Sequence, residues 1–226
     1  MKTVISTFLL ALALSTELIY GQTFKIQYGR DWSTLKWPKN GEYSIFKSSL
    51  NGNTLFFGID YFNRKYFNLS SNIGYLQKQG TKSYDKYYDN THTTLVQAVT
   101  SIEQLSINTK VNIKYPIKDK LVPFLCVGLC YDNLLSQSHK EDRISNVESG
   151  IFGLILGAGA YYKISRIQIG LNIEYSDYLS NFALLEERPS PGMTGFLPAE
   201  KIKSHTILLG VTFAYVMKKI SLSRTN

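Results

Sequence analysis

The three histidines are the residues of this 226-residue chain best suited to proton transfer or metal binding. They are His92, His139 and His205, and they lie far apart in the sequence. No HExxH motif occurs, and the histidines are not spaced as a pair of metal ligands on one element. We therefore expect no metal site, and no other motif predicts a cofactor.

Two serine–histidine neighbours could supply the nucleophile and the general base of a hydrolase. They are Ser138–His139 and Ser204–His205. Neighbouring side chains in a β-strand point to opposite faces, so Ser204 and His205 cannot readily share one site if they lie in a strand. We therefore favour a non-enzymatic protein over an enzyme.

Cys126 and Cys130 are the only cysteines. In a strand they would share one face with their Cα atoms about 13 Å apart. A disulfide needs Cα atoms closer than about 7 Å. We expect both to be unpaired small residues that fill an interior.

The segment SINTKVNIKY (106–115) indicates which kind of element positions these residues. Apolar and polar residues alternate through it, with Thr109 the one exception in the apolar row. A period of two predicts a strand with two unlike faces. The alternation alone leaves open whether the apolar face is buried in a soluble sheet or faces lipid in a membrane barrel.

Seven further segments have strand character, which predicts eight strands, although ten is not excluded. The eight are 23–29, 53–62, 65–77, 101–116, 121–132, 150–163, 166–178 and 203–217. Tight turns are expected around Asn63–Arg64, Lys118–Asp119 and Ile164–Ser165, and long polar segments at 30–52, 78–100, 133–149 and 179–202. Parts of these segments, 42–50 or 93–100, could extend strands beyond a membrane. Alternating short turns and long loops are typical of outer-membrane barrels.

The strand glycines favour the membrane barrel over a soluble, ligand-binding β-barrel in the periplasm. Eight of them fall in the polar rows: Gly58, Gly74, Gly128, Gly153, Gly157, Gly159, Gly170 and Gly210. Glycine weakens a strand unless space is short, and the interior of an eight-stranded barrel is narrow. We therefore predict an all-β, eight-stranded, antiparallel, up-and-down transmembrane β-barrel with its apolar rows facing lipid.

Charged residues in the polar rows would then face one another inside the barrel. Asp60 and Glu174 would lie opposite Lys25, Lys110 and Lys114. These charges could line a path for a small solute. A structural network that satisfies buried charges is the favoured interpretation, because side chains should fill a barrel of this size.

The two ends of the chain are predicted to lie outside the barrel. Residues 1–21 have the charged start and short apolar run of a signal peptide, which predicts export. The barrel would then span 22–217, with a short tail at 218–226. The net charge of +8 suits either a solubilising surface or anionic lipid headgroups, and we favour the former.

Several stretches resemble the outer-membrane β-barrel family of Bacteroidota known as PorT-like. They are VPFLCVGLCYD (122–132), FGLILGAGAYYKISRIQIGLNIEYSDYL (152–179) and HTILLGVTFAYVMKK (205–219), and the resemblance covers most of the mature chain. The residues after Tyr215 depart from the aromatic ending of many such barrels. The resemblance implies a protein of the outer membrane, and membership of a secretion apparatus is not carried over.

The expected function is therefore structural, adhesive or complex-anchoring, with a plugged lumen. Expected partners are outer-membrane lipid and, through the long loops, envelope proteins or extracellular ligands. No nucleic acid is expected. The alternatives are a lipid-modifying barrel enzyme and the soluble ligand-binding barrel.

Overall fold

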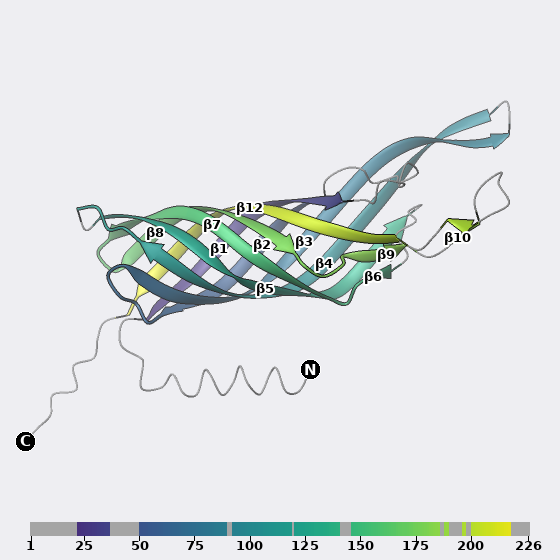
Figure 1. Cartoon of the computed structure of the whole chain (residues 1–226). Coiled ribbons are helices and arrows are strands. Elements are labelled where there is room, and N and C mark those ends of the chain that lie inside the picture. Colours follow the sequence, from purple (N-terminus) through teal and green to yellow (C-terminus); the bar gives the residue numbers. More distant parts are fainter. Residues whose placement is uncertain are drawn as a thin grey trace, which may run out of the picture.

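A computed structural model describes residues 22–36, 50–89, 92–118, 120–140, 146–185, 188–189, 196–197 and 200–217. In this part of the chain, eight long antiparallel strands form a closed barrel (Figure 1). They are β1 (Thr23–Lys36), β2 (Leu50–Tyr61), β3 (Phe67–Asp89), β4 (His92–Lys114), β5 (Leu121–Lys140), β7 (Gly150–Ile164), β8 (Ile167–Tyr178) and β12 (Glu200–Val216). The barrel closes because β1 pairs with both β2 and β12. The predicted fold class is confirmed.

Four short strands accompany the barrel: β6 (Asn146–Val147), β9 (Ala183–Leu185), β10 (Arg188–Pro189) and β11 (Phe196–Leu197). β9 pairs with the start of β12 and with β6, while β10 pairs with β11. Among the described residues, no helix is long and apolar enough to cross a bilayer. The predicted signal peptide (1–21) and tail (218–226) lie outside the described residues.

The tight turns and both ends of the described chain gather at one end of the barrel, here called the turn end (Figure 1). β2 and β3 are joined around Asn63, β4 and β5 around Lys118, and β7 and β8 around Ser165, as predicted. Lys118 and Ser165 have positive φ angles of 47° and 56°, a backbone conformation typical of tight turns. The opposite end is called the ribbon end below.

The four long polar segments were predicted as loops, and this prediction is wrong for much of their length. Nearly all of 78–100 belongs to β3 and β4, which confirms only the idea that 93–100 extends a strand. Strand also covers 30–36, 50–52, 133–140 and parts of 179–202, whereas 42–49 lies outside the described residues. These stretches carry polar residues on both parities, so they lack the alternation that marks a strand between lipid and lumen.

The longest strands form a two-stranded ribbon beyond the barrel. β2 accompanies β3 only as far as Gln79, and β5 accompanies β4 only from Val99 onward. Residues 80–89 and 92–98 are called the ribbon. Within the described part of the chain, 80–89 pair only with β4 and 92–98 pair only with β3. At the usual rise per residue, they extend about 30 Å past their neighbours. Figure 1 shows the ribbon leaving the barrel on the side away from the termini.

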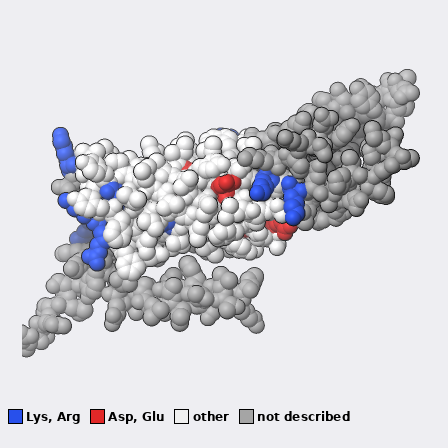
Figure 2. Space-filling model, viewed as in Figure 1, with Lys and Arg blue, Asp and Glu red and all other residues white. Residues whose placement is uncertain are grey.

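The apolar rows face outward, as predicted. Leu125 and Leu171 are 62% and 63% exposed on the wall, whereas Lys110 and Asn172 are only 4% and 5% exposed inside. On the face drawn in Figure 2, few charged atoms lie between the ends of the wall. Arg30 is an exposed charge in the outward row of β1, beside Trp32. Exposed aromatic residues lie toward the two ends of the wall: Trp32, Tyr75, Tyr131 and Tyr175 near the ribbon end, and Tyr66, Tyr115, Tyr162 and Tyr215 near the turn end. This is the surface of a protein surrounded by hydrocarbon with two interfacial belts.

The strand glycines make room for large side chains inside. A Cβ on Gly74 would collide with the ring of Phe56, and one on Gly159 would come within 2.6 Å of the ring of Phe124. Gly150 is an exception, because a Cβ there would meet the hydroxyl of the outward-facing Tyr131. The inward glycines were predicted from a narrow, crowded lumen, and the lumen is crowded at these positions.

Candidate functional site

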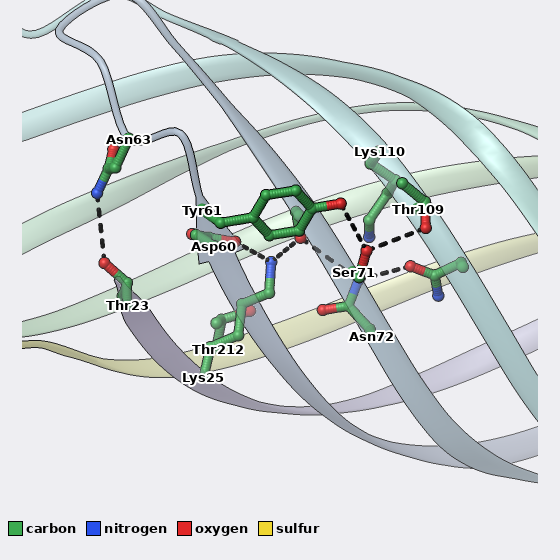
Figure 3. Close-up of polar contacts among 12 residues, drawn as sticks. Thr23, Lys25, Asp60, Tyr61, Asn63, Ser71, Asn72, Thr109, Lys110 and Thr212 are labelled. Carbon is green, nitrogen blue, oxygen red and sulfur yellow. Dashed lines mark hydrogen bonds and ion pairs between the residues drawn. The ribbon is translucent and has the colours of Figure 1, made fainter. Parts of the chain in front are cut away.

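The barrel lumen holds a dense set of buried polar side chains in its half nearer the turn end. The Nζ of Lys25 donates to Asp60 Oδ1 at 2.7 Å and also contacts the hydroxyl of Ser70. Figure 3 shows Lys25 of β1 reaching toward Asp60 of β2 across the inner face of the wall. Both side chains are less than 10% exposed, so water has little access to them. Each charge is therefore neutralised by its partner.

A second ion pair joins β4 to β8. The Nζ of Lys110 donates to Glu174 Oε1 at 2.7 Å, and Asn172 Nδ2 donates to the same oxygen at 2.8 Å. Asn72 Nδ2 donates to Asn108 Oδ1 at 2.5 Å in the same region. The two ion pairs with these three asparagines are called the lower network. It links β1, β2, β3, β4 and β8.

The fifth residue predicted for this network, Lys114, lies elsewhere. Its Nζ donates to Asn63 Oδ1 at 2.5 Å, which joins the end of β4 to the β2–β3 turn. Asn63 in turn donates to Thr23 Oγ1 at 3.4 Å (Figure 3). The structure therefore brings Lys25, Asp60, Lys110 and Glu174 into two pairs and leaves Lys114 at the turn end.

Apolar side chains lie inside the barrel on both sides of the lower network. Phe124 and Tyr161 stack toward the turn end, with ring centroids 4.8 Å apart and planes 15° apart. Phe56, Leu76 and Leu208 form a buried apolar cluster on the side of the ribbon end. Apolar groups thus occupy the lumen at two levels, one on each side of the buried charges.

A second set of buried charges lies beyond that apolar cluster, toward the ribbon end. Lys78 Nζ is 3.9 Å from Asp31 Oδ2 and donates to Thr206 Oγ1 at 3.3 Å. The hydroxyl of Tyr178 donates to Asp132 Oδ2 at 2.5 Å, and Lys78 Nζ lies 5.5 Å from the centre of the Tyr178 ring. Asp31, Lys78, Asp132, Thr206 and Tyr178 are called the upper cluster. All five are less than 5% exposed.

Sequence reasoning missed the upper cluster because Asp31 and Lys78 fall in segments predicted as loops. One signal could have found Asp31. It shares the parity of Lys25, Gln27 and Gly29, so extending the inward row of β1 leads directly to it. Lys78 likewise shares the parity of Ser70, Asn72 and Gly74, so extending the inward row of β3 leads to it.

The candidate catalytic pair Ser204–His205 is divided by the wall, as predicted. Ser204 faces the lumen with 0% exposure, while His205 lies on the outer face. There His205 Nδ1 is 2.7 Å from Asp177 Oδ1 and 2.9 Å from the hydroxyl of Tyr175. The side chains of His92 and His139 lie outside the described residues.

Two further predictions concern small polar groups. Cys126 and Cys130 are unpaired and buried on the inward face of β5, as predicted. On the outer face, Ser71 Oγ is 3.0 Å from both the hydroxyl of Tyr61 and Thr109 Oγ1 (Figure 3). Thr109 interrupts the apolar row, but its hydroxyl has a hydrogen-bond partner in a chain of hydroxyls across β2, β3 and β4.

Comparison with solved structures places this fold among the outer-membrane β-barrels. OprG of Pseudomonas aeruginosa matches with a TM-score of 0.53 and 14% identity, over 88% of this chain and 97% of that one. Ail of Yersinia pestis, solved with the heparin analogue sucrose octasulfate, matches with a TM-score of 0.42 and 13% identity, over 87% and 100%. The outer-membrane protease OmpT of Escherichia coli gives a TM-score of 0.41 at 7% identity, over 87% and 97%.

At these identities the likeness shows the fold alone. No family model matches the chain, and no curated protein matches its sequence. The resemblance to the PorT-like barrels of Bacteroidota therefore stays a prediction.

Proposed function

We propose that this chain is an exported, non-enzymatic outer-membrane protein that acts through the parts it presents outside the cell. Its role would be adhesion, anchoring of an envelope complex, or support of the membrane. The turn end would face the periplasm and the ribbon end the exterior, since barrels of this kind have short periplasmic turns and longer extracellular connections.

The ribbon is the observation that carries this proposal. A two-stranded hairpin is at best marginally stable alone in water, and its outer edges present unpaired backbone groups. Residues 80–89 and 92–98 have no other described strand beside them. An extended strand of a partner could pair with either edge, which is a recurrent way of recognising peptides.

The filled lumen argues against transport as the main task. The lower network neutralises four charges in two ion pairs, and the cluster of Phe56, Leu76 and Leu208 separates it from the upper cluster. Opening a continuous path would require breaking a buried ion pair or displacing this apolar layer. We expect no steady large currents when the purified protein is placed in planar lipid bilayers.

The ribbon can be tested with two variants. One replaces 80–98 by a short turn, and the matched control replaces it by a Gly/Ser segment of equal length, which keeps the length but not the strands. Slower gel migration after heating would verify that both barrels fold. We expect both variants to lose surface attachment of cells and crosslinked envelope partners. Unchanged attachment and partners without the ribbon would contradict the proposal.

A lipid-modifying enzyme keeps one observation in its favour. Asp177 holds His205 Nδ1 at 2.7 Å, which is how a carboxylate orients a histidine base, and Thr34 lies directly opposite His205 on β1. Incubation of the folded protein with radiolabelled lipids tests this alternative. Product release that is lost in His205→Ala would replace the non-enzymatic proposal.

A further inference from the structure

Charged side chains are unevenly distributed around the ribbon end of the wall. The outward residues of β2 and β3 at this level are neutral: Asn51, Asn53, Gln77 and Gln79. On β12, by contrast, Lys201, Lys203 and His205 alternate with the buried Ile202 and Ser204 and therefore point outward. These three residues are called the basic row. Figure 2, which colours lysine but not histidine, shows blue atoms gathered near the ribbon end of the wall, with red atoms close by.

The basic row has the geometry of a continuous site. Alternate residues of a strand are about 7 Å apart, so the row extends over about 13 Å. Its histidine is held in place, because Nδ1 contacts Asp177 Oδ1 at 2.7 Å and the Tyr175 hydroxyl at 2.9 Å. The other ring nitrogen, Nε2, is buried and has no hydrogen-bond partner within the described part of the chain. Nε2 of His205, at the inner end of the row, thus makes no hydrogen bond to the described residues.

The row begins where the apolar wall ends. Ile207 follows His205 in the outward series of β12 and is 45% exposed, and Trp32 pairs with it on β1. Aromatic side chains of this kind lie at the level of lipid headgroups. The basic row therefore lies at or just beyond the headgroups of the outer leaflet in the orientation proposed above.

Lysines at membrane interfaces commonly extend toward water and so anchor a barrel at any point on its rim. That general effect would distribute basic residues around the rim and would not gather them on β12. We propose that the basic row binds the phosphate-bearing headgroup of a glycolipid in the outer leaflet. Ammonium groups of Lys201 and Lys203 would neutralise the phosphate, and His205, held by Asp177 and Tyr175, would mark the end of the row at the hydrocarbon boundary.

The inference uses the orientation in the proposed function but not the closed lumen or the role of the ribbon. Its failure can therefore be distinguished from theirs. Conductance and attachment assays report on the lumen and the ribbon, whereas lipid titration reports on the wall of β12.

The experiment compares two triple variants of the full chain, folded in a neutral detergent. The site variant carries Lys201→Gln, Lys203→Gln and His205→Gln. The control carries Lys118→Gln, Lys120→Gln and Arg166→Gln, which remove three exposed basic groups at the turn end. Each is titrated with lipid A bearing two phosphates, with dephosphorylated lipid A, and with inorganic pyrophosphate, using native mass spectrometry at low and high salt. Heat-modifiable migration verifies folding.

We expect the site variant to lose affinity for phosphorylated lipid A by roughly fivefold for each lysine removed, and the control to lose less than about twofold. Wild-type binding should weaken in high salt and fall strongly with the dephosphorylated lipid. Equal loss in both variants, or equal binding of both lipids, would overturn the proposal. If pyrophosphate competes at the same concentration as the lipid, the site recognises phosphate alone and the lipid assignment is wrong.

Discussion

The lower network and the upper cluster accommodate buried charged side chains in two different ways. In the lower network, two lysines face two carboxylates, and each Nζ lies 2.7 Å from its carboxylate oxygen. In the upper cluster, Lys78 lies 3.9 Å from Asp31, while Asp132 accepts a hydrogen bond from the Tyr178 hydroxyl. Two buried aspartates thus share a cluster with one lysine.

The unused hydrogen-bonding capacity of the charged groups follows the same division. Both carboxylate oxygens of Asp31 and one of Asp132 are buried without a described hydrogen-bond partner. All four charged groups of the lower network have at least one close partner. A buried ion pair contributes little net stability, but removal of one partner is costly because it leaves an unpaired charge. The two regions should therefore respond to loss of an aspartate in opposite ways.

The largest effect is expected in the lower network. Asp60→Asn should lower the free energy of unfolding by about 3–5 kcal/mol, because Lys25 is then left as an unpaired buried cation. Urea unfolding of the protein in lipid vesicles measures this change.

The double variant Lys25→Met with Asp60→Leu serves as the control for this prediction. It removes both charges, so its stability should return to within about 1–2 kcal/mol of the wild type. A single variant as stable as the wild type would show that Lys25 does not depend on Asp60 for neutralisation.

The apolar layer between the two regions should be the next most sensitive. Gly74→Ala places a Cβ against the Phe56 ring, so Phe56, Leu76 or Leu208 must move. Overpacking of this kind costs about 1–3 kcal/mol. Urea unfolding gives the loss, and the paired substitution Gly74→Ala with Phe56→Leu should recover part of it. A loss of equal size in the paired variant would mean that the ring is not the obstacle.

The contrast between the regions also separates what the sequence predicts from what it does not. Strand number, closure and the outward apolar rows follow from alternation that continues through each membrane segment. The inward positions of Lys25, Asp60, Lys110 and Glu174 follow from the same parity. Parity does not predict which charges pair with each other, because the pairing depends on how the strands are staggered around the barrel.

The alternation of apolar and polar residues does not predict two features of the structure. Lys114 shares the inward parity but stands at the last residue of β4, where the nearest acceptor is Asn63 of a turn and not a lumen carboxylate. The ribbon lies where both parities are polar, so nothing in the pattern there distinguishes strand from loop. Long-range pairing between β3 and β4 decides the structure there. Asp31 and Lys78 of the upper cluster lie in similar stretches, and only an extension of the inward rows leads to them.

The upper cluster provides the contrasting test, in which loss of an aspartate should not lower the free energy of unfolding. Asp31→Asn removes the carboxylate 3.9 Å from Lys78 but also the repulsion between Asp31 and Asp132, and Lys78 keeps its hydrogen bond to Thr206. The free energy of unfolding should therefore stay within about 1 kcal/mol of the wild type or rise. Urea unfolding in vesicles gives the value beside that of Asp60→Asn. A loss as large as that of Asp60→Asn would mean that Asp31 is neutralised by a group other than Lys78.

The smallest effect is expected at Lys114, the lysine that leaves the network. Lys114→Gln keeps a donor that can reach Asn63 and removes a charge that is not paired with a described carboxylate. A single hydrogen bond near the surface contributes about 0.5–1.5 kcal/mol, and glutamine should retain part of it. The change in unfolding free energy should therefore be less than about 1 kcal/mol. A loss above about 3 kcal/mol would place Lys114 among the charges on which the lower network depends, and the network would then extend to the turn end.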